Sequence, residues 1–276
     1  MSIQRSDGGR VRVLSFTSGK GGVGKTCLAV NLGYWLAKMG ARVLLLDADL
    51  GLANVDIVLG LRPSFTLEHV LAGQKGISEI MMGGPGGMRV LPAGSGVAKL
   101  ADLGEEARLQ IFNELDAIEE PFDYLFVDTG AGISRNVLYF NAAVQDVVVV
   151  ATPEPTSLTD AYALMKVLSE GRRGYRFRIL ANMVADEREG KGVFRRLSAV
   201  TDKYLNVSLS YLGHVVQDPN MAASVRRQQA MSEAFPKSAA ARCLRGLAEK
   251  IHRLPPDELP AGHMHFFWRR LAAQGA

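Results

Sequence analysis

The sequence predicts a doubly wound α/β fold, in which helices cover both faces of a mostly parallel sheet. Short runs rich in Val, Ile and Leu alternate with segments of helical periodicity along most of the chain. Several of these runs are apolar throughout, which indicates strands buried on both faces. The chain has 276 residues, 47% of them hydrophobic and 22% charged, so it can form a sizeable core in one large domain or two small ones.

Each expected strand is a β-branched or leucine-rich run, from VRVLSFT near the start to LSYLGHV in the last quarter of the chain. The expected strands cover residues 11–17, 42–47, 88–93, 124–128, 146–151, 177–182 and 209–215. The expected helices occupy the stretches between and after them. They cover residues 25–39, 105–118, 134–143, 157–170, 187–204 and 238–252.

A proline-rich stretch divides the chain near its end. LPPDELPAG, residues 254–262, ends the last of these helices at about Arg253, because proline cannot continue a helix. We therefore expect a main domain in residues 1–253, a linker in 254–262 and a separate helix in 263–276.

Composition and targeting signals narrow the functional classes. The formal net charge is +4, and the two cysteines have neither metal-binding nor redox spacing. The first ten residues, MSIQRSDGGR, contain no apolar run of the secretory type. No apolar run approaches the roughly 20 residues that span a bilayer. We expect a cytoplasmic protein.

Residues 19–26, GKGGVGKT, fit the phosphate-loop pattern G-x-x-x-x-G-K-[ST] between a buried strand and a periodic helix. The glycines allow backbone N–H groups to turn towards phosphate oxygens, and the helix N-terminus adds partial positive charge. Lys25 is expected to reach the β- and γ-phosphates of ATP, and the Thr26 hydroxyl to bind Mg²⁺. The alternative is a glycine-rich turn without a ligand. The residues expected to hold the nucleotide are Gly19, Lys20, Gly21, Gly22, Val23, Gly24, Lys25, Thr26 and Cys27.

Lys20 is a second lysine that an ordinary phosphate loop does not need. To serve its own nucleotide it would have to fold back over glycines that already enclose the phosphates. It can instead point outwards, across a face on which a second copy could dock. The alternative is a solvated surface lysine.

Two expected strands end in aspartates. Asp47 and Asp49 follow RVLLL and project to the same side, which suits a Mg²⁺ hydration shell at Asp47 and an attacking water at Asp49. The alternative is that Asp47 caps the next helix. Asp128 ends YLFVD and is expected to bind Mg²⁺ through water, while Gly130 and Gly132 let the backbone respond to the γ-phosphate. Hydrolysis then requires only positioning and charge neutralisation, with Lys20, Lys25 and Asp49 as the catalytic residues.

KGGVGKT resembles the deviant Walker A motif of the MinD/ParA class, which belongs to the SIMIBI P-loop NTPases. The resemblance implies an ATP-dependent homodimer in which Lys20 reaches the partner's nucleotide, and it assigns hydrolysis to Asp49. Asn182 resembles the adenine-contacting asparagine of the class. Asp218 resembles the acidic residue of its base-side loop, although Val215-Val216-Gln217 departs from the common IPED form. Glu154 lies at the position where members of the class make contacts between subunits. The alternative is that Glu154 only caps the next helix.

Four segments narrow the resemblance to one branch. DADLGLANVDIVLGL, LPAGSG, VDTGAGIS and TPEPTSLTDAYALMKVL are similar to the FlhG/FleN (YlxH) ATPases, which regulate flagellar number and placement. The resemblance implies partners among FleQ-type transcription regulators, flagellar switch-ring components and the GTPase FlhF. The DQAxxLR motif that activates FlhF is not visible in the first ten residues, so activation by that route is not expected.

The last segment has an apolar stripe on a helical wheel, formed by Met264, Phe267, Trp268 and Leu271. Arg269 and Arg270 lie off the stripe, which is the composition of an interfacial helix. The resemblance implies ATP-dependent binding at the inner face of the cell membrane. The alternative is that the stripe docks on its own domain.

The leading hypothesis is a slowly hydrolysing ATP switch that acts on flagellar number, placement or gene expression. A MinD-like division-site ATPase and a non-hydrolysing scaffold remain alternatives. DNA partition of the ParA type is a further alternative, but charge runs more often form a solvated face, so DNA is not the expected partner. The arginines that would carry it are Arg172, Arg173, Arg176, Arg178, Arg195, Arg196, Arg226 and Arg227.

Overall fold

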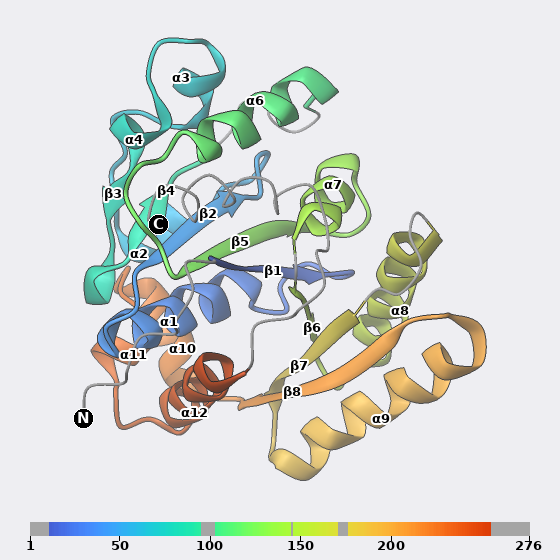
Figure 1. The fold of residues 1–276 in the computed structure, drawn as a ribbon. Helices are drawn as coiled ribbons and strands as arrows, with labels where there is room; N and C mark the ends of the chain where they lie inside the picture. The colour runs from blue at the N-terminus through green and yellow to red at the C-terminus, as the bar shows by residue number, and fades with distance from the viewer. Residues whose placement is uncertain (1–10, 95–102, 145, 171–175, 255–276) are drawn as a thin grey trace.

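The computed structural model describes residues 11–94, 103–144, 146–170 and 176–254. In these residues the chain forms an eight-stranded sheet in the order β3-β4-β2-β5-β1-β6-β7-β8 (Figure 1). All neighbouring strands pair in parallel except β3, which is antiparallel to β4. The strands are β1 (Arg12–Ser18), β2 (Val43–Ala48), β3 (Met82–Gly83), β4 (Arg89–Leu91), β5 (Tyr124–Ala131), β6 (Asp146–Ala151), β7 (Arg176–Val184) and β8 (Ser208–Val216).

The predicted doubly wound fold is confirmed, and each predicted strand is present. The predictions missed β3, whose two residues are too few to show an alternating pattern. They also ended β5 too early, because Gly130 and Ala131, which complete its extension, are residue types that are depleted in strands.

The long helices lie close to their predicted ranges, whereas the short ones were not predicted. Helices of four to eight residues complete too few turns to show a clear 3.6-residue period. The helices are α1 (Lys25–Lys38), α2 (Val55–Leu59), α3 (Leu67–Leu71), α4 (Ile77–Ile80), α6 (Glu105–Asp116), α7 (Arg135–Ala143), α8 (Pro155–Glu170), α9 (Glu187–Tyr204), α10 (Pro219–Arg226), α11 (Met231–Ala234) and α12 (Ala239–Arg253), with a 3₁₀ turn η1 (Pro85–Gly87).

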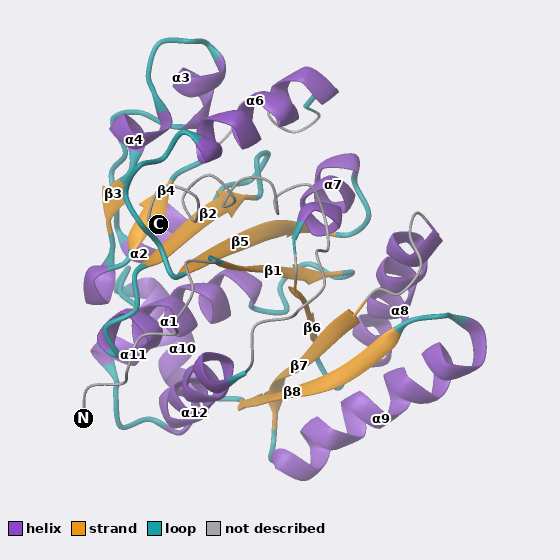
Figure 2. Ribbon diagram, in the orientation of Figure 1, coloured by secondary structure: helices purple, strands orange, loops and turns teal. Residues whose placement is uncertain are grey.

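The sheet has an apolar core on each face. Figure 2 shows the helices that lie on both sides of its strands. Leu44 and Leu46 of β2 pack into the core that includes α3, α6, α7, α8 and α9. Leu45, which lies between them, packs into the opposite core with α1, α11 and α12. Successive side chains of a strand point to opposite faces, so burial of all three requires both layers.

Helix α1 is buried along most of its length, including Leu28, Val30, Leu32 and Leu36. It packs between the sheet and α12. This burial fixes the N-terminus of α1 in place at the end of β1, which is where the phosphate loop lies.

A buried ion-pair network lies at the opposite end of the sheet. Asp146, at the start of β6, accepts hydrogen bonds from Nε and Nη2 of Arg12 at 2.9 and 2.7 Å and from Nε of Arg178 at 2.5 Å. Arg12 Nη1 also donates to the carbonyls of Ile251 and Leu254 at 3.0 and 3.2 Å. The network therefore joins three strands to the C-terminal end of α12.

Several predictions lie outside the described residues. These are most of the 254–262 linker, the 263–276 helix and the first ten residues, together with Met264, Phe267, Trp268, Leu271, Arg172 and Arg173. Among the described helices, none has the length and hydropathy needed to cross a membrane.

Candidate nucleotide site

The phosphate loop connects Ser18, at the end of β1, to Lys25, the first residue of α1. Gly22 and Gly24 have φ values of 76° and 91°, in the left-handed region that favours glycine. A Cβ on Gly24 would also lie 2.6 Å from Nδ2 of Asn182, so a larger residue there would displace this side chain. The first turn of α1 has no acidic residue and no side-chain cap. Its N–H groups therefore suit an anion.

Lys25 is only 8% exposed, and it faces the two acidic strand ends. Burial lowers the pKa of its ammonium group, while the charges of Asp128 and Asp49 act in the opposite direction. A triphosphate would add negative charge at the same place and would favour the protonated form. Lys25 is therefore buried near both aspartates, and its contact with phosphate stays a prediction.

The Asp128 carboxyl group is buried, and one of its two oxygens accepts no hydrogen bond from the described residues. Burial raises the pKa of its carboxyl group to about 7, against the opposing effects of a hydrogen bond with the Thr26 side chain and the charge of Lys25. Within the described residues its Oδ1 has no hydrogen-bond partner. A buried oxygen without a partner beside a threonine hydroxyl suits Mg²⁺, a hard cation that prefers oxygen ligands.

No group of three or more His, Cys, Asp or Glu side chains in the described part of the chain could form a metal cage. Magnesium at nucleotide sites usually needs only one or two carboxylates, because phosphates and water complete its coordination. The residues present therefore fit a Mg²⁺ ion carried by the nucleotide.

The Asp47 side chain caps the start of α2, which is the alternative to a metal-binding role. Its Oδ2 accepts hydrogen bonds from the backbone N–H groups of Asn54 and Val55, both at 3.0 Å, and its Oδ1 accepts one from Asp49 at 3.2 Å. The side chain thus fixes the loop after β2 and the start of α2. It pairs in register with Asp128 on β5, and burial raises its pKa. Its role in the Mg²⁺ hydration shell stays a prediction.

Asp49 lies next to the segment that follows Asp128. A Cβ on Gly130 would come within 3.1 Å of Asp49 Oδ1, so the glycine makes room for this carboxylate. Burial raises the pKa of Asp49, and the charge of Lys25 opposes that rise. Gly132, with a φ of 86°, donates its N–H to the Ser18 carbonyl at 2.9 Å. The two predicted switch segments and the phosphate loop therefore meet at one place.

Lys20 contacts two side chains of its own chain, and its predicted contact with a partner's nucleotide stays a prediction. Its Nζ lies 2.5 Å from Oε2 of Glu154 and 3.0 Å from Oγ1 of Thr156, at the start of α8. The Glu154 carbonyl accepts a hydrogen bond from Leu158 N, so its backbone helps to begin α8 while its side chain holds Lys20. Sequence reasoning did not anticipate this contact within one chain.

Asn182 contacts the phosphate loop, whereas the contacts of Asp218 are with α10 and the start of α12. Nδ2 of Asn182 donates to the Val23 carbonyl at 2.8 Å. Asp218 caps α10 by accepting from Asn220 N at 2.9 Å, and it also accepts from Ala240 N at 3.0 Å. Burial would raise the pKa of Asp218, but these hydrogen bonds lower it overall. Contact of either residue with a base stays a prediction.

The arginines considered for DNA do not all lie on a surface. The Arg178 side chain is 16% exposed and is paired with the buried Asp146. Arg196 donates to the Gly192 carbonyl of its own helix, and the Arg227 guanidinium lies 4.9 Å from the centre of the Phe235 ring. Arg178 is therefore not available to contact DNA on the predicted basic surface.

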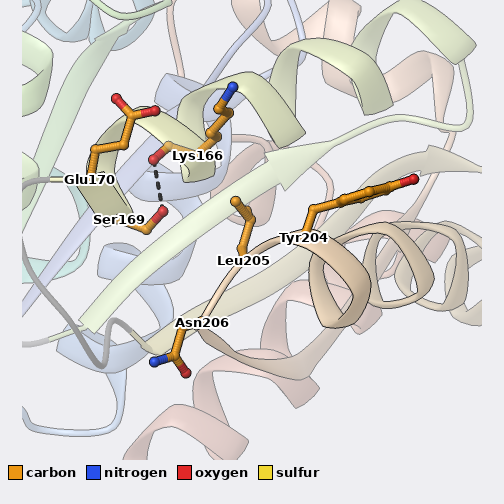
Figure 3. A pocket seen from close by; sticks show the side chains of 6 residues that line it. All are labelled: Lys166, Ser169, Glu170, Tyr204, Leu205 and Asn206. Carbon is orange, nitrogen blue, oxygen red and sulfur yellow. Dashed lines mark hydrogen bonds between the residues drawn. The ribbon is translucent and has the colours of Figure 1, made fainter.

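A cavity of about 530 Å³ lies away from this site, between the ends of α8 and α9 (Figure 3). In Figure 3 the Ser169 hydroxyl turns back to the Lys166 carbonyl, at 2.7 Å. No residue of the phosphate loop contributes to this cavity. Its lining residues are Lys166, Ser169, Glu170, Tyr204, Leu205 and Asn206.

Cys27 provides a chemical probe of the loop. Burial, together with the charge of Asp128, raises the pKa of its thiol to about 11, so about one molecule in a thousand carries the thiolate at pH 8. In a Cys243→Ser background we expect slow alkylation by iodoacetamide, rising about tenfold per pH unit up to the pKa, and slower still with Mg-ADP. Mass spectrometry measures the rate. Rapid labelling at pH 8 that Mg-ADP leaves unchanged would contradict this placement.

Comparison with known proteins places these features in context. An AAA domain family model matches residues 11–176. The chain is 44% identical over 266 residues to the antiactivator FleN of Pseudomonas aeruginosa, covering 96% of this chain and 95% of that protein. It is 32% identical to the flagellum site-determining protein YlxH of Helicobacter pylori, covering 95% and 90%. The solved structure of the cell division protein MinD from Aquifex aeolicus matches with a TM-score of 0.71 and 25% identity, covering 90% of this chain and 99% of that one.

Proposed function

Because the chain belongs to the FleN/FlhG (YlxH) branch of the MinD/ParA ATPases, we propose that it is an ATP-driven switch that regulates flagellar number, placement or gene expression. The observation that carries the proposal is the 44% identity to a protein named as an antiactivator, which extends over 96% of this chain. The phosphate loop, Asp49 and Asp128 meet at one site, which supports turnover of ATP rather than an inert scaffold.

Each part of the site has a role in the proposed reaction. The N-terminus of α1 and Lys25 bind the phosphates, and Asp49 orients the water that attacks the γ-phosphate. Thr26 and Asp128, whose Oδ1 has no hydrogen-bond partner among the described residues, would hold Mg²⁺. The ion would supply positive charge that offsets the charge of the phosphates. Turnover should be slow until a partner completes the site.

A homodimer is the proposed ATP-bound form. Leu52 and Ile133 are 72% and 52% exposed, and they flank the two switch segments beside Asp49 and Gly132. Exposed apolar side chains beside both switch segments support burial of these segments against a second copy. In the proposed dimer, Lys20 leaves Glu154 and Thr156 and contacts the partner's nucleotide.

Size-exclusion chromatography with light scattering tests the switch. We expect a monomer without ATP, and a stable dimer for Asp49→Ala with ATP because this variant binds without hydrolysing. Lys20→Ala should stay monomeric with ATP. A wild-type protein that remains monomeric at saturating ATP, together with a monomeric Asp49→Ala variant, would refute the proposal.

Glu154→Gln should make dimerisation easier, since it removes the negative charge that holds Lys20. Exposed ion pairs contribute about 0.2–1 kcal/mol, and each of the two copies breaks one pair when the dimer forms. The protein concentration for half dimerisation with ATP should therefore fall by up to about thirtyfold. Glu79→Gln is the matched control, because it breaks a similarly exposed pair with Lys75 at 2.8 Å. A higher concentration for Glu154→Gln alone would mean that Glu154 acts in the dimer instead.

The proposed partners are a FleQ-type regulator, FlhF or a switch-ring protein, and the proposed location is the cytoplasm or the inner face of the membrane. Residues 263–276 would provide the membrane contact. Deleting residues 261–276 and measuring co-sedimentation with liposomes and ATP tests that role. Unchanged co-sedimentation would exclude the helix as the lipid contact.

A further inference from the structure

The face of β1 that meets α7 carries two fully buried hydroxyl side chains, Ser15 and Thr17. Successive residues of a strand point to opposite faces, so these two share a face with Val13, whereas Phe16 points to the other side. Val13 belongs to the apolar core that includes α7 and α8. Hydroxyl groups in such surroundings are costly unless they form hydrogen bonds.

One side chain of α7 binds both hydroxyl groups. The Ser15 hydroxyl donates to Oδ1 of Asn141 at 2.6 Å, and Nδ2 of Asn141 donates to Oγ1 of Thr17 at 3.1 Å. The same Nδ2 donates to the carbonyl of Val137, one turn earlier in α7, at 2.7 Å. Asn141 is itself fully buried, and both polar atoms of its amide group have partners. The network therefore joins α7 to the end of the strand that leads into the phosphate loop.

The segment between β5 and α7 is attached to the same stretch of β1. The Thr129 hydroxyl donates to the Phe16 carbonyl at 3.0 Å, and the Gly132 N–H donates to the Ser18 carbonyl at 2.9 Å. Asn141 binds the side chains of the two residues that alternate with these carbonyls. Helix α7, which packs against β5 and β1 (Figure 1), is thus held to β1 together with the switch segment that precedes it.

The position of α7 affects the switch segment through Val137. A Cβ on Gly130 would lie 3.6 Å from Cγ2 of Val137 and 3.1 Å from Oδ1 of Asp49. A shift of α7 along β1 would therefore move Gly130 relative to Asp49. Apolar packing is not directional, so a leucine in place of Asn141 would leave such a shift unopposed. Hydrogen bonds to two hydroxyl groups on one strand fix the register of the helix.

We propose that Asn141 is a positioning residue for ATP hydrolysis, an inference that rests on the proposed function. By holding α7 in register with β1, it places Gly130 and Asp49 correctly relative to the phosphate loop. Asn141 acts through α7 and does not touch the nucleotide. Binding of ADP depends on the loop and Lys25 and should not need Asn141, whereas turnover of ATP should.

Steady-state hydrolysis and calorimetry on the full chain test this difference. Asn141→Leu keeps the branched side chain but removes both hydrogen-bonding atoms. Its kcat for ATP should fall by about ten- to hundredfold, because small misplacements of reacting groups slow catalysis strongly. Its KM for ATP and its affinity for Mg-ADP should stay within about threefold of the wild type.

A combined variant separates positioning from stability. Asn141→Leu leaves the hydroxyl groups of Ser15 and Thr17 buried without partners, so its melting temperature should fall. Adding Ser15→Ala and Thr17→Val removes these groups as well, so most of that loss should be recovered while kcat stays low. Thr201→Val is the control. It removes another fully buried hydroxyl, which donates to the Leu197 carbonyl at 3.0 Å in α9, and kcat should be unchanged.

Three results would contradict the inference while the proposed function stands. Wild-type kcat in Asn141→Leu would mean that the register of α7 does not affect hydrolysis. Recovery of both kcat and melting temperature in the combined variant would leave the network a purely stabilising role. A loss of Mg-ADP affinity as large as the loss of kcat would assign Asn141 to the phosphate loop instead. A wild-type protein that neither binds ADP nor hydrolyses ATP would refute the proposed function itself.

Discussion

Lys25→Ala is expected to weaken ATP binding by at least about a hundredfold, because it removes the buried cation at the phosphate site. The ammonium group lies among Asp49 and Asp128, and without it these carboxylates would repel a triphosphate. Calorimetric titration with Mg-ATP measures the change.

Lys20→Ala is the matched control for that experiment. Lys20 belongs to the same loop, but its Nζ is held outwards by Glu154 and Thr156. Its loss should change ATP affinity of the monomer by no more than a few fold. If Lys25→Ala bound ATP as tightly as the wild type, the nucleotide would have to lie elsewhere.

Asp146→Ala should destabilise the fold by about 3–5 kcal/mol, because it leaves two arginines without the buried carboxylate between them. For a protein of this size the melting temperature should fall by about 10 °C or more. Urea unfolding followed by circular dichroism measures the free energy of unfolding.

Glu120→Gln provides the comparison, because it breaks an exposed pair with Arg89 at 3.4 Å. Exposed pairs contribute about 0–1 kcal/mol, so this variant should unfold almost like the wild type. Equal effects of the two substitutions would mean that the Asp146 network contributes no more than a surface ion pair.

The parts of the site that a sequence predicts well are those set by neighbouring residues. The phosphate loop requires glycines at fixed spacing, and Asp49 and Asp128 follow apolar strands whose parallel pairing brings their ends together. The long helices and buried strands follow from periodicity for the same reason. These features depend on local backbone geometry, which a short stretch of sequence specifies.

The features that escaped prediction depend on residues far apart in the chain or on backbone conformation. The Lys20–Glu154 contact joins residues separated by 134 positions, and no pattern within either segment indicates it. Asp47 could have bound magnesium or capped α2, and only the arrangement of three N–H groups around it distinguishes its contacts. The positive φ of Met183 has no sequence signal, because methionine rarely adopts it.

The central position of β1 in the sheet affects how the chain folds during translation. Residues 12–18 leave the ribosome early, yet their strand neighbours β5 and β6 end at residues 131 and 151. The carbonyls that Arg12 contacts, at Ile251 and Leu254, emerge later still. Pairing between strands so far apart in the sequence is slow. Until β5 and β6 have been synthesised, the apolar side chains of β1 stay exposed. We therefore expect the nascent chain to need chaperones until synthesis is nearly complete, and a prematurely terminated chain to be degraded before it can bind nucleotide.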